Sequence, residues 1–449
     1  MSLKLVLLYY KIMNMNYSEA LQYLYNSMPV FHLTGADAYK PGFTNTLKLM
    51  DLTMHPYLNY KTIHVGGTNG KGSVSHLLSA VLQSAGYKVG LYTSPHLVDF
   101  SERIKVNGQP IDNQYVIDYI EKYNVDFELI KPSFFEATMA MAFSYFSDQQ
   151  VDIAIIEVGL GGRLDSTNII KPEVSVITNI SFDHVAFLGD TLQKIAFEKA
   201  GIIKPKTPVV IGEYNEDTYV VFNNTASQNE SKIYYAENEV FIKIIEQSID
   251  KQLLSINNED VFEVGLGGTY QIKNISTVYK TIQILQKLNF QISKSDIYKG
   301  FKSVTELTGF MGRWQCFGKN PLIICDTAHN EAGIGEISKH LKSLKFKKLR
   351  IVFGMVNDKD ISSVLKLLPI NAMYYFTNAN IARALPANEL QIQASKHGLV
   401  GNSYSIVELA VLDAINSAAS DDLVLIIGSN FIVGEAITAL KKINQIINI

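Results

Sequence analysis

"HVGGTNGKGSVSHLLSAVLQSAG", residues 64–86, is the stretch that decides the fold of the first part of this chain. It opens at the end of a β-branched run, "KTIHV" at 61–65, and then becomes rich in glycine. After Lys71 the apolar residues recur at helical spacing, at Val74, Leu77, Leu78, Val81 and Leu82. Gly86 ends that helix, and "YKVGLYTS" at 87–94 reads as a second strand. The stretch therefore predicts a unit of strand, tight loop, helix and strand.

A glycine-rich loop between a strand and a helix is suited to binding phosphate. Its backbone N–H groups can surround phosphate oxygens, and the helix N-terminus adds partial positive charge. Lys71 would reach the β- and γ-phosphates, and the Ser73 hydroxyl would hold Mg²⁺. The loop departs from GxxxxGK[ST], since three residues separate Gly66 from Gly70 and Gly72 precedes Ser73. The alternative is a turn that binds nothing, and the loop alone leaves kinases, motor proteins, GTPases and ligases open.

The same alternation of apolar strands and helices continues along the chain. Strands are predicted at 151–159, 174–180 and 207–213, and helices at 134–146, 191–204 (with Thr191 as N-cap) and 272–288. Residues 214–265 predict an irregular or small-sheet region, and a second series places strands within 322–330, 347–355, 372–378 and 423–429. Continuous apolar strands are typical of parallel sheets covered on both faces.

We therefore predict two α/β domains. Residues 15–303 form an N-terminal P-loop ATPase domain with a mainly parallel sheet, and residues 304–449 form a smaller Rossmann-like α/β domain. The division lies near "SVTELTGFMGRWQ", around 302–312. Residues 1–14 are read as an N-terminal extension, because "MNYSEALQYL" from Met15 predicts the start of a helix.

Composition limits the possible partners. The 449 residues carry a net charge of −3, which does not favour a nucleic-acid or membrane surface. Cys316 and Cys325 lack a CxxC pattern, so we expect free thiols in a reducing cytosol. The apolar run at 3–10 is too short to span a bilayer, and no small-residue cleavage site follows it. We expect a cytoplasmic protein.

Nine motifs, taken in order along the chain, are more specific to one family than the glycine-rich loop alone. In chain order they are "HVGGTNGKGS" at 64–73, "SPHLVDFSERIKVNG" at 94–108, "FFEATMAMAF" at 134–143, "EVGLGGRLDSTN" at 157–168, "ITNISFDHVAFLGDTLQKIAFEKAGIIK" at 177–204, "GRWQ" at 312–315, "DTAHN" at 326–330, "GMVNDKD" at 354–360 and "IIGSNFIVGE" at 426–435. Together they resemble the folylpolyglutamate synthases and dihydrofolate synthases of the Mur-ligase superfamily. The resemblance runs from about Met15 to near the end of the chain.

The resemblance implies ATP-dependent amide ligation. A folate or dihydropteroate carboxylate would attack the γ-phosphate to form an acyl phosphate, and the amine of L-glutamate would then displace phosphate. ATP and Mg²⁺ at two sites are the implied cofactors, and a monomer is the implied state. Because the reaction brings two anions together, Mg²⁺, Lys71 and backbone donors would neutralise charge and align the transfer.

The resemblance also implies roles for particular residues. The nucleotide would be bound by Thr68, Asn69, Gly70, Lys71, Gly72 and Ser73, with Asn274 at the adenine, Arg313 at phosphate and Asp326 at the ribose. The metals would be held by Ser73, Glu136 and His184. Catalysis would involve Lys71, His329 and Lys199, the last resembling a lysine that is carbamylated in many of these ligases. The acyl substrate would be bound by Ser94, His96, Phe100, Arg103, Arg163 and Asp165, with Glu157 also lining the cleft.

Most of these residues also have a plain structural alternative. Glu136 could be a first-turn glutamate favoured by the helix dipole, and Lys199 a lysine near a helix C-terminus. His184 could be an ordinary loop histidine, and the residues of 94–103 could lie on a surface loop. Asn330 could cap the helix that follows it, Asp326 could simply end a strand, and Asp358 and Asp360 could open a helix.

The chain departs from the family pattern at a few loop positions. Met311 stands where proline is common before "GR", "TAHNE" replaces "GAHNP", and "GSNF" changes the residues after Ser429. These changes remove no candidate charged group, so they concern loop geometry. Two other hypotheses remain at this point: a Mur-type ligase of another carboxylate, and a non-catalytic ATP-binding regulator.

Overall fold

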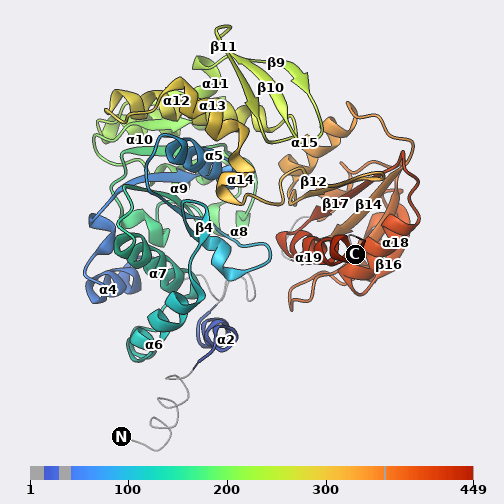
Figure 1. Ribbon diagram of the computed structural model, residues 1–449, viewed down its shortest axis with the longest axis horizontal. Coiled ribbons are helices and arrows are strands. Elements are labelled where there is room, and N and C mark those ends of the chain that lie inside the picture. Colours follow the sequence, from blue (N-terminus) through green and yellow to red (C-terminus); the bar gives the residue numbers. More distant parts are fainter. Residues whose placement is uncertain (1–14, 30–41, 358–360, 448–449) are drawn as a thin grey trace, which may run out of the picture.

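The predicted strand–loop–helix–strand unit lies at the centre of an eight-stranded sheet in the computed structural model, which describes residues 15–29, 42–357 and 361–447 (Figure 1). The strand order is β4-β3-β2-β5-β1-β6-β7-β8. Pairing is parallel from β2 through β8 and antiparallel at β3 and β4, which confirms the mainly parallel sheet. The strands are β1 (Lys61–Gly66), β2 (Val89–Tyr92), β3 (Ile104–Val106), β4 (Gln109–Pro110), β5 (Ile153–Glu157), β6 (Val174–Ile177), β7 (Val209–Ile211) and β8 (Ile233–Tyr235).

Helices cover both faces of this sheet, as its buried strands require. One face carries α5 (Lys71–Ser84), α11 (Ala236–Glu239), α12 (Gln271–Lys287), α13 (Lys294–Lys302) and α14 (Val304–Thr308). The other carries α2 (Tyr17–Ser27), α4 (Thr44–Leu52), α6 (Asn113–Ile130), α7 (Phe134–Asp148), α9 (Leu192–Ala200) and α10 (Glu216–Gln228). Short helices η2 (Pro56–Leu58), η3 (Phe100–Arg103), η4 (Ser166–Ile169) and α8 (Val185–Leu188) lie in the connections. Thr191 caps α9 as predicted, accepting from the backbone N–H of Lys194.

The region at 214–265 holds more regular structure than its sequence predicts. Helix α10 and strand β8 extend the first domain, and the small sheet is the antiparallel trio β9 (Ile242–Gln247), β10 (Gln252–Ile256) and β11 (Asp260–Val264). This sheet projects beside α12 and α13 in Figure 1.

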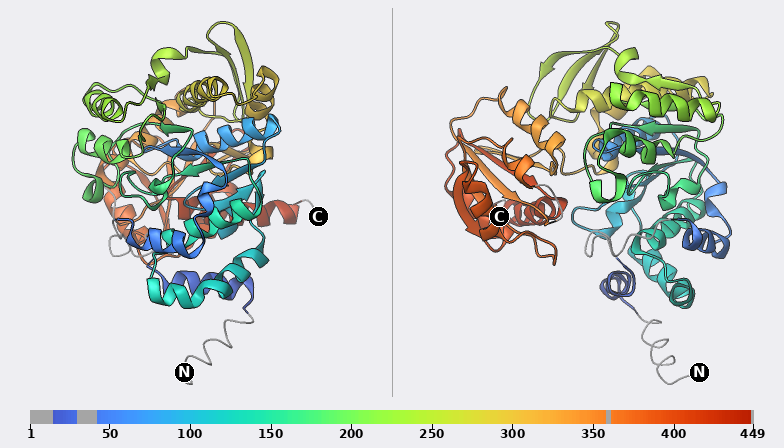
Figure 2. Two further views of the ribbon diagram at one scale, coloured as in Figure 1. Left: turned by 90° about the vertical axis from the view of Figure 1, so that its left-hand side faces the viewer. Right: turned by 180° about the vertical axis from the view of Figure 1, so that it is seen from behind.

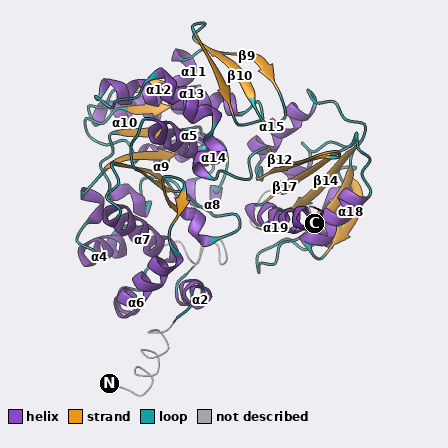
Figure 3. Ribbon diagram, in the orientation of Figure 1, coloured by secondary structure: helices purple, strands orange, loops and turns teal. Residues whose placement is uncertain are grey.

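The second domain is a six-stranded sheet of order β12-β13-β17-β14-β15-β16, parallel except at β12 (Figure 3). Its strands are β12 (Gln315–Lys319), β13 (Leu322–Asp326), β14 (Leu349–Gly354), β15 (Met373–Thr377), β16 (Val400–Tyr404) and β17 (Leu423–Gly428). Helices α15 (Glu331–Leu341), α16 (Ile361–Leu365) and α17 (Ala387–Ser395) cover one face, and α18 (Val407–Asn416) and α19 (Asn430–Ile447) cover the other. Cys316 and Cys325 are free thiols on β12 and β13.

The chain passes between the domains at residues 309–314. Val304 and Phe310 are buried in the first-domain core, and β12 begins the second sheet at Gln315. Helix α14 thus packs with the first domain, whereas the predicted division at 303/304 precedes it. The right-hand view of Figure 2 shows the two domains side by side from behind, and in the left-hand view the first domain lies in front of the second.

Two sequence expectations lie outside the described residues: the extension at 1–14, and the helix start at Asp358 and Asp360. Within the described ranges, every helix is too short or too polar to cross a lipid bilayer.

Candidate active site

The loop after β1 has the geometry expected of a phosphate-binding loop. Gly70 adopts φ 85° at the N-cap of α5, and a Cβ there would lie 2.2 Å from Oδ1 of Asn274. A Cβ at Gly67, with φ 137°, would lie 1.9 Å from Oγ1 of Thr178. Both positions therefore need glycine. Because the first-turn N–H groups of a helix have no intrahelical acceptor, the start of α5 can receive an anion.

Two lysines meet at this loop. Lys71 Nζ donates to the carbonyl oxygens of Gly67 (3.1 Å) and Thr68 (3.0 Å), and Lys199 Nζ donates to the same Gly67 oxygen (2.9 Å). Burial, and secondarily the charge of Lys71, lower the pKa of Lys199 to about 7. Burial also lowers the pKa of Lys71. The pair forms a cationic wall that an anionic ligand would stabilise.

A carboxylate faces these lysines from the end of β5. Glu157 is 4% exposed, and one of its oxygens accepts from the backbone N–H of Ser94 at 3.2 Å. Burial raises the pKa of Glu157 to about 7, and Lys71 partly opposes this shift. Glu157 and both lysines line one cavity, which we call the P-loop pocket. Its lining is residues 67–72, 94–95, 157–161, 183–184, Leu188, Lys199, Arg313, His329 and Asn430.

Asp183 lies between two histidines on the domain boundary. Its Oδ1 is 3.9 Å from Nε2 of His184, and its Oδ2 is 3.8 Å from Nε2 of His329 in the second domain. Asn330 Nδ2 donates to Asp183 Oδ2 at 3.2 Å, and His329 Nδ1 donates to the carbonyl of Thr327 at 2.8 Å. Sequence reasoning missed Asp183, although it stands directly before His184.

A second cavity, the outer pocket, continues from the P-loop along the domain boundary. It is lined by several of the residues expected at a nucleotide, among them Asn69, Ser73, Asn274, Arg313, Asp326 and His329. The carboxylate of Asp326 already accepts from Tyr270 Oη (2.5 Å) and from the backbone N–H groups of Trp314 (2.8 Å) and Ala328 (2.9 Å). Asp326 therefore also holds the start of the second-domain loop in shape.

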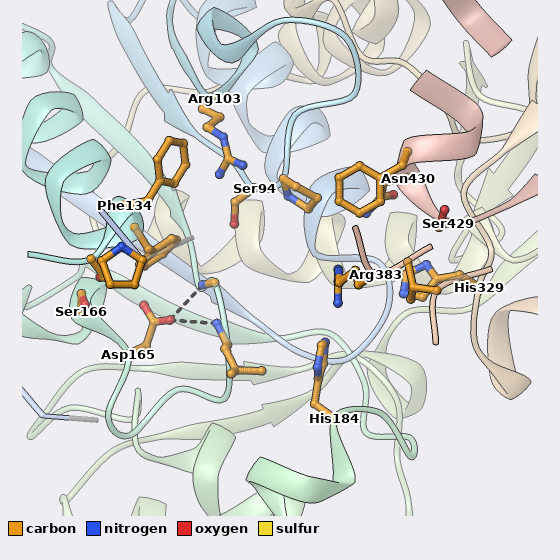
Figure 4. Close-up of a pocket in the computed structure, with 18 of the residues that line it drawn as sticks. Ser94, Arg103, Phe134, Asp165, Ser166, His184, His329, Arg383, Ser429 and Asn430 are labelled. Carbon is orange, nitrogen blue, oxygen red and sulfur yellow. Dashed lines mark hydrogen bonds between the residues drawn. The ribbon is translucent and has the colours of Figure 1, made fainter. Parts of the chain in front are cut away.

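The third cavity, the wide pocket, is mostly apolar and opens beside the P-loop pocket (Figure 4). In Figure 4, Arg103, Phe134 and Asp165 of the first domain face His329, Arg383, Ser429 and Asn430 of the second. The Arg103 guanidinium lies 5.1 Å from the centre of the Phe134 ring. The pocket offers an aromatic wall and cations at both ends, which suits a flat anionic molecule.

The three cavities lie next to one another because the loops that line them follow the carboxyl ends of parallel strands. The loops after β1, β5 and β6 supply the first-domain walls, and those after β13, β14, β15 and β17 supply the second-domain walls. Ligand sites of open α/β sheets form at these ends.

Comparisons with known proteins agree with this geometry. Residues 65–281 match the Mur ligase middle domain, and residues 312–430 match the glutamate ligase domain of Mur ligases. The dihydrofolate synthase/folylpolyglutamate synthase of Bacillus subtilis is 32% identical over 418 residues, covering 90% of this chain and 95% of that protein. The chain belongs to the dihydrofolate synthase/folylpolyglutamate synthase family. It is thus a ligase of the Mur type, and the resemblance inferred from the nine motifs is confirmed.

Solved structures of the family share the whole fold. E. coli FolC in complex with DHPP and ADP superposes with a TM-score of 0.83 at 28% identity, covering 96% of this chain and 99% of that one. The Yersinia pestis folylpolyglutamate synthase/dihydrofolate synthase complexed with AMPPNP and Mn ion gives 0.80 at 28% identity, covering 95% and 98%.

Glu136 does not join the site that the family resemblance predicts for it. Its carboxylate accepts from the backbone N–H (2.7 Å) and hydroxyl (2.8 Å) of Ser133, and Thr46 lies 3.4 Å away. This is the capping box of α7, and Glu136 lines none of the three cavities above. The glutamate whose side chain lines the P-loop pocket is Glu157, not Glu136.

Three substrate residues also need correction. Arg163 turns outward, 43% exposed, and pairs with Glu198 at 2.9 Å. Phe100 is only 1% exposed and packs edge-on against Phe134 in the core. His96 accepts from Nε of Arg103 at 2.7 Å and so orients that arginine; it lines a small polar cavity beside the P-loop, with Glu157 and Arg313, and not the wide pocket.

The remaining substrate residues of the prediction, Ser94, Arg103 and Asp165, do line the wide pocket. Asp165 accepts from the backbone N–H groups of Gly159 (3.0 Å) and Leu160 (2.9 Å) and from Thr167. It therefore shapes the pocket wall as well as facing it.

The residues at the P-loop fit a hard divalent cation of the kind this family uses. Ser73 supplies a buried hydroxyl oxygen at the start of α5, which lines the outer pocket and accepts from Nε2 of Gln271 at 3.2 Å, and Glu157 supplies a carboxylate to the P-loop pocket. In the part of the chain that the structure describes, His, Cys, Asp and Glu form no group of three that would hold a metal unaided. Mg²⁺ keeps waters and takes phosphate oxygens, so two protein oxygens are an ordinary contribution.

Proposed function

We propose that this enzyme uses ATP to join L-glutamate to the carboxylate of a folate, of dihydropteroate, or of both. The observation that carries this proposal is the continuity of two cavities. The P-loop pocket and the wide pocket share the walls Ser94, Pro95, Gly159, Leu160, His184, His329 and Asn430. A flat substrate in the wide pocket can therefore present its carboxylate to a γ-phosphate at the P-loop.

The charges of the P-loop pocket support phosphoryl transfer to a carboxylate. The nucleophile is already ionised, so the chain needs no strong base. What it needs is compensation where two anions meet, and Lys71, Arg313 and the N-terminus of α5 all line that place. Attack gives an acyl phosphate and ADP, and the glutamate amine then forms the amide while phosphate leaves. Bound Mg²⁺ would supply further charge neutralisation beside Ser73 and Glu157.

The second domain supplies groups suited to the incoming glutamate. Arg383 lies in the wall of the wide pocket with Ser429 and Asn430, at the side formed by the second sheet. A guanidinium there is suited to a carboxylate of the amino acid. Asp183 and His329 line the neighbouring part of the P-loop pocket, where the ammonium would lose a proton before attack.

We further infer that Lys199 carries a carbamate in the active enzyme. Carbamate formation needs a neutral amine, and burial next to Lys71 lowers the pKa of Lys199 to about 7. The modification replaces a buried cation with an anion that accepts hydrogen bonds and faces Lys71. His184, which lines the same pocket, would then lie near an oxygen ligand able to assist a second cation.

The test is incorporation of labelled L-glutamate with MgATP, offering dihydropteroate and tetrahydrofolate in separate reactions. Product with dihydropteroate assigns dihydrofolate synthesis, and product with tetrahydrofolate assigns polyglutamylation. We expect Lys71→Ala to lower turnover by at least about a hundredfold with an unchanged circular dichroism spectrum. Release of phosphate from ATP without incorporation into either acceptor would contradict the proposal.

A further inference from the structure

Lys105 is a buried lysine that the reaction itself does not use. It lies on β3, is 4% exposed, and its pKa is lowered by burial. Its Nζ donates to the carbonyl oxygens of Thr308 (2.8 Å) and Gly309 (3.3 Å). Those carbonyls end helix α14, so the ammonium caps the helix where its dipole is negative. The chain leaves the first domain immediately afterwards.

A second side chain holds the same helix end from another element. His76 of α5 is 5% exposed, and its Nδ1 is 2.8 Å from Oγ1 of Thr308. The Thr308 hydroxyl donates to the carbonyl of Val304 at 2.6 Å, so the hydrogen between His76 and Thr308 belongs to the histidine. Two first-domain elements thus fix the last residues before the linker.

The linker then runs directly past the P-loop to Arg313. The Phe310 ring lies 4.4 Å from the His76 ring, and 3.8 Å from the place a Cβ of Gly72 would occupy. Gly309 and Gly312 turn the chain with φ 61° and 72°. Arg313 therefore enters the P-loop pocket only four residues beyond the carbonyl that Lys105 holds. A linker this short leaves Arg313 little freedom once its origin is fixed.

The small polar cavity beside the P-loop is lined both by the residues that hold the end of α14 and by Arg313. Lys105, His76, Glu157, Gly72 and Arg313 all line it, so the anchor and the arginine face one space beside the P-loop. Without the Lys105 ammonium, the carbonyls of Thr308 and Gly309 would lose the hydrogen bonds that it donates to them. The end of α14 and the linker could then shift together.

We propose that Lys105 is a positioning residue that fixes the origin of the interdomain linker and thereby places Arg313 at the phosphates of the nucleotide. It acts through Arg313 and touches neither substrate nor nucleotide. The inference rests on the proposed function only for the assignment of nucleotide to the P-loop pocket.

The experiment measures the dissociation constant of Mg·AMPPNP by calorimetry in a double-mutant cycle. Lys105→Met keeps the unbranched stem of the side chain and removes the donor, and we expect about tenfold weaker binding. Arg313→Ala should weaken binding at least as much. If Lys105 acts through Arg313, adding Lys105→Met to Arg313→Ala should change the constant less than about twofold. Lys105→Arg, which keeps a charged donor, should restore most of the affinity.

Lys204→Met is the matched control. Lys204 is also partly buried in the first domain, and its Nζ donates to a backbone carbonyl, that of Asn168, at 2.6 Å. It is remote from the linker in sequence and lines none of the pockets above, so its loss should leave nucleotide affinity unchanged. Equal weakening by Lys105→Met with and without Arg313, or unchanged affinity of Lys105→Met, would overturn the proposal.

Two features keep the test decisive. If Lys105→Met unfolds, Lys105→Gln, whose amide is uncharged and one bond shorter than the ammonium, is measured in the same cycle, with the same two outcomes. The assay needs no folate and no glutamate, so a chain that binds nucleotide but ligates nothing would contradict the proposed function and leave this inference standing.

Discussion

At the residue scale, the surroundings of Lys199 lower its pKa far enough for the side chain to react as a neutral amine near pH 7. An exposed lysine has a pKa near 10.5 and stays charged at neutral pH, whereas burial and Lys71 bring that of Lys199 to about 7. The amine is therefore mostly protonated below pH 7 and mostly neutral above it. Only the neutral form combines with carbon dioxide, so the carbamate proposed above should accumulate as pH rises through about 7.

This predicts a carbamate carbon signal in the ¹³C spectrum of protein equilibrated with labelled bicarbonate at pH 8. The signal should weaken at pH 6, together with turnover, and should be absent from Lys199→Met. Lys194→Met is the control on the same helix, because Lys194 is 63% exposed and pairs with Asp190 at its side. A signal that persists in Lys199→Met, or that vanishes in Lys194→Met, would refute the assignment to Lys199.

The same pKa shift has a consequence for stability, with a definite sign. Between pH 7 and 10 the unfolded chain binds a proton at Lys199 that the unmodified folded chain lacks. The contribution of this group to the free energy of unfolding therefore rises with pH over that window, by at most about 1.4 kcal/mol per unit. Glu157, whose pKa is raised to about 7, acts in the opposite direction between its ordinary 4.5 and 7.

At the scale of elements, the sequence predicts where strands and helices lie better than where their side chains point. Strand β1, helix α5 and strand β5 follow from apolar periodicity, and the loops after the two strands, with the N-terminus of α5, do form the site. The antiparallel trio after Val240 is less evident, because half-exposed strands such as β9 lack a continuous apolar run. Arg163 and Phe100 lie in the right motifs but face away, since loop geometry, not spacing, sets their direction.

The exchange of Glu136 for Glu157 is the most instructive difference. "SFFE" at 133–136 carries the capping-box pattern of serine followed by glutamate three residues later, and the structure forms that box, whereas the structural alternative expected for Glu136 from the sequence rested only on the helix dipole. Glu157 ends a buried strand in a parallel sheet, at the edge where ligands bind. The strand-end position therefore indicates function, and the helix-start position indicates stability.

Paired substitutions test this distinction. Glu157→Gln keeps the shape of the side chain and removes its charge, and we expect turnover to fall by about a hundredfold or more. Glu136→Ala should leave the Michaelis constant for ATP unchanged and lower the free energy of unfolding by about 1 kcal/mol, through loss of the capping box. Steady-state kinetics and urea unfolding measure both. Full activity in Glu157→Gln would contradict the assignment of the pocket carboxylate.

At the scale of the whole molecule, the site is complete only while the two domains stay together. Asn69 of the P-loop and Asn330 of the second domain exchange two amide hydrogen bonds, at 3.2 and 3.0 Å. Asn330 also donates to Asp183, and its Oδ1 caps α15 by accepting from Gly333 at 2.9 Å. The N-cap role was foreseen from the sequence, but a partner 261 residues away was not, because nothing local encodes it.

Asn330→Asp separates these two roles of the residue. Aspartate caps a helix as well as asparagine does, so α15 should keep its start and the melting temperature should change little. The substitution removes the amide donor to Asn69 and sets a carboxylate beside Asp183, so the domains should separate more readily. We expect turnover to fall about tenfold, and a spin-label pair across the boundary to show a longer and broader distance distribution.

Asp183→Asn provides the compensating change. Combined with Asn330→Asp, it returns a donor and an acceptor to that contact and removes the repulsion between two carboxylates. The double variant should therefore recover the short distance distribution, whereas Asp183→Asn alone should not lengthen it. Recovery concerns closure and not turnover, because Asp183 also lines the P-loop pocket beside Lys199. A wild-type distribution in Asn330→Asp alone would show that the domains are held together by other contacts, and that the amide pair only reports their approach.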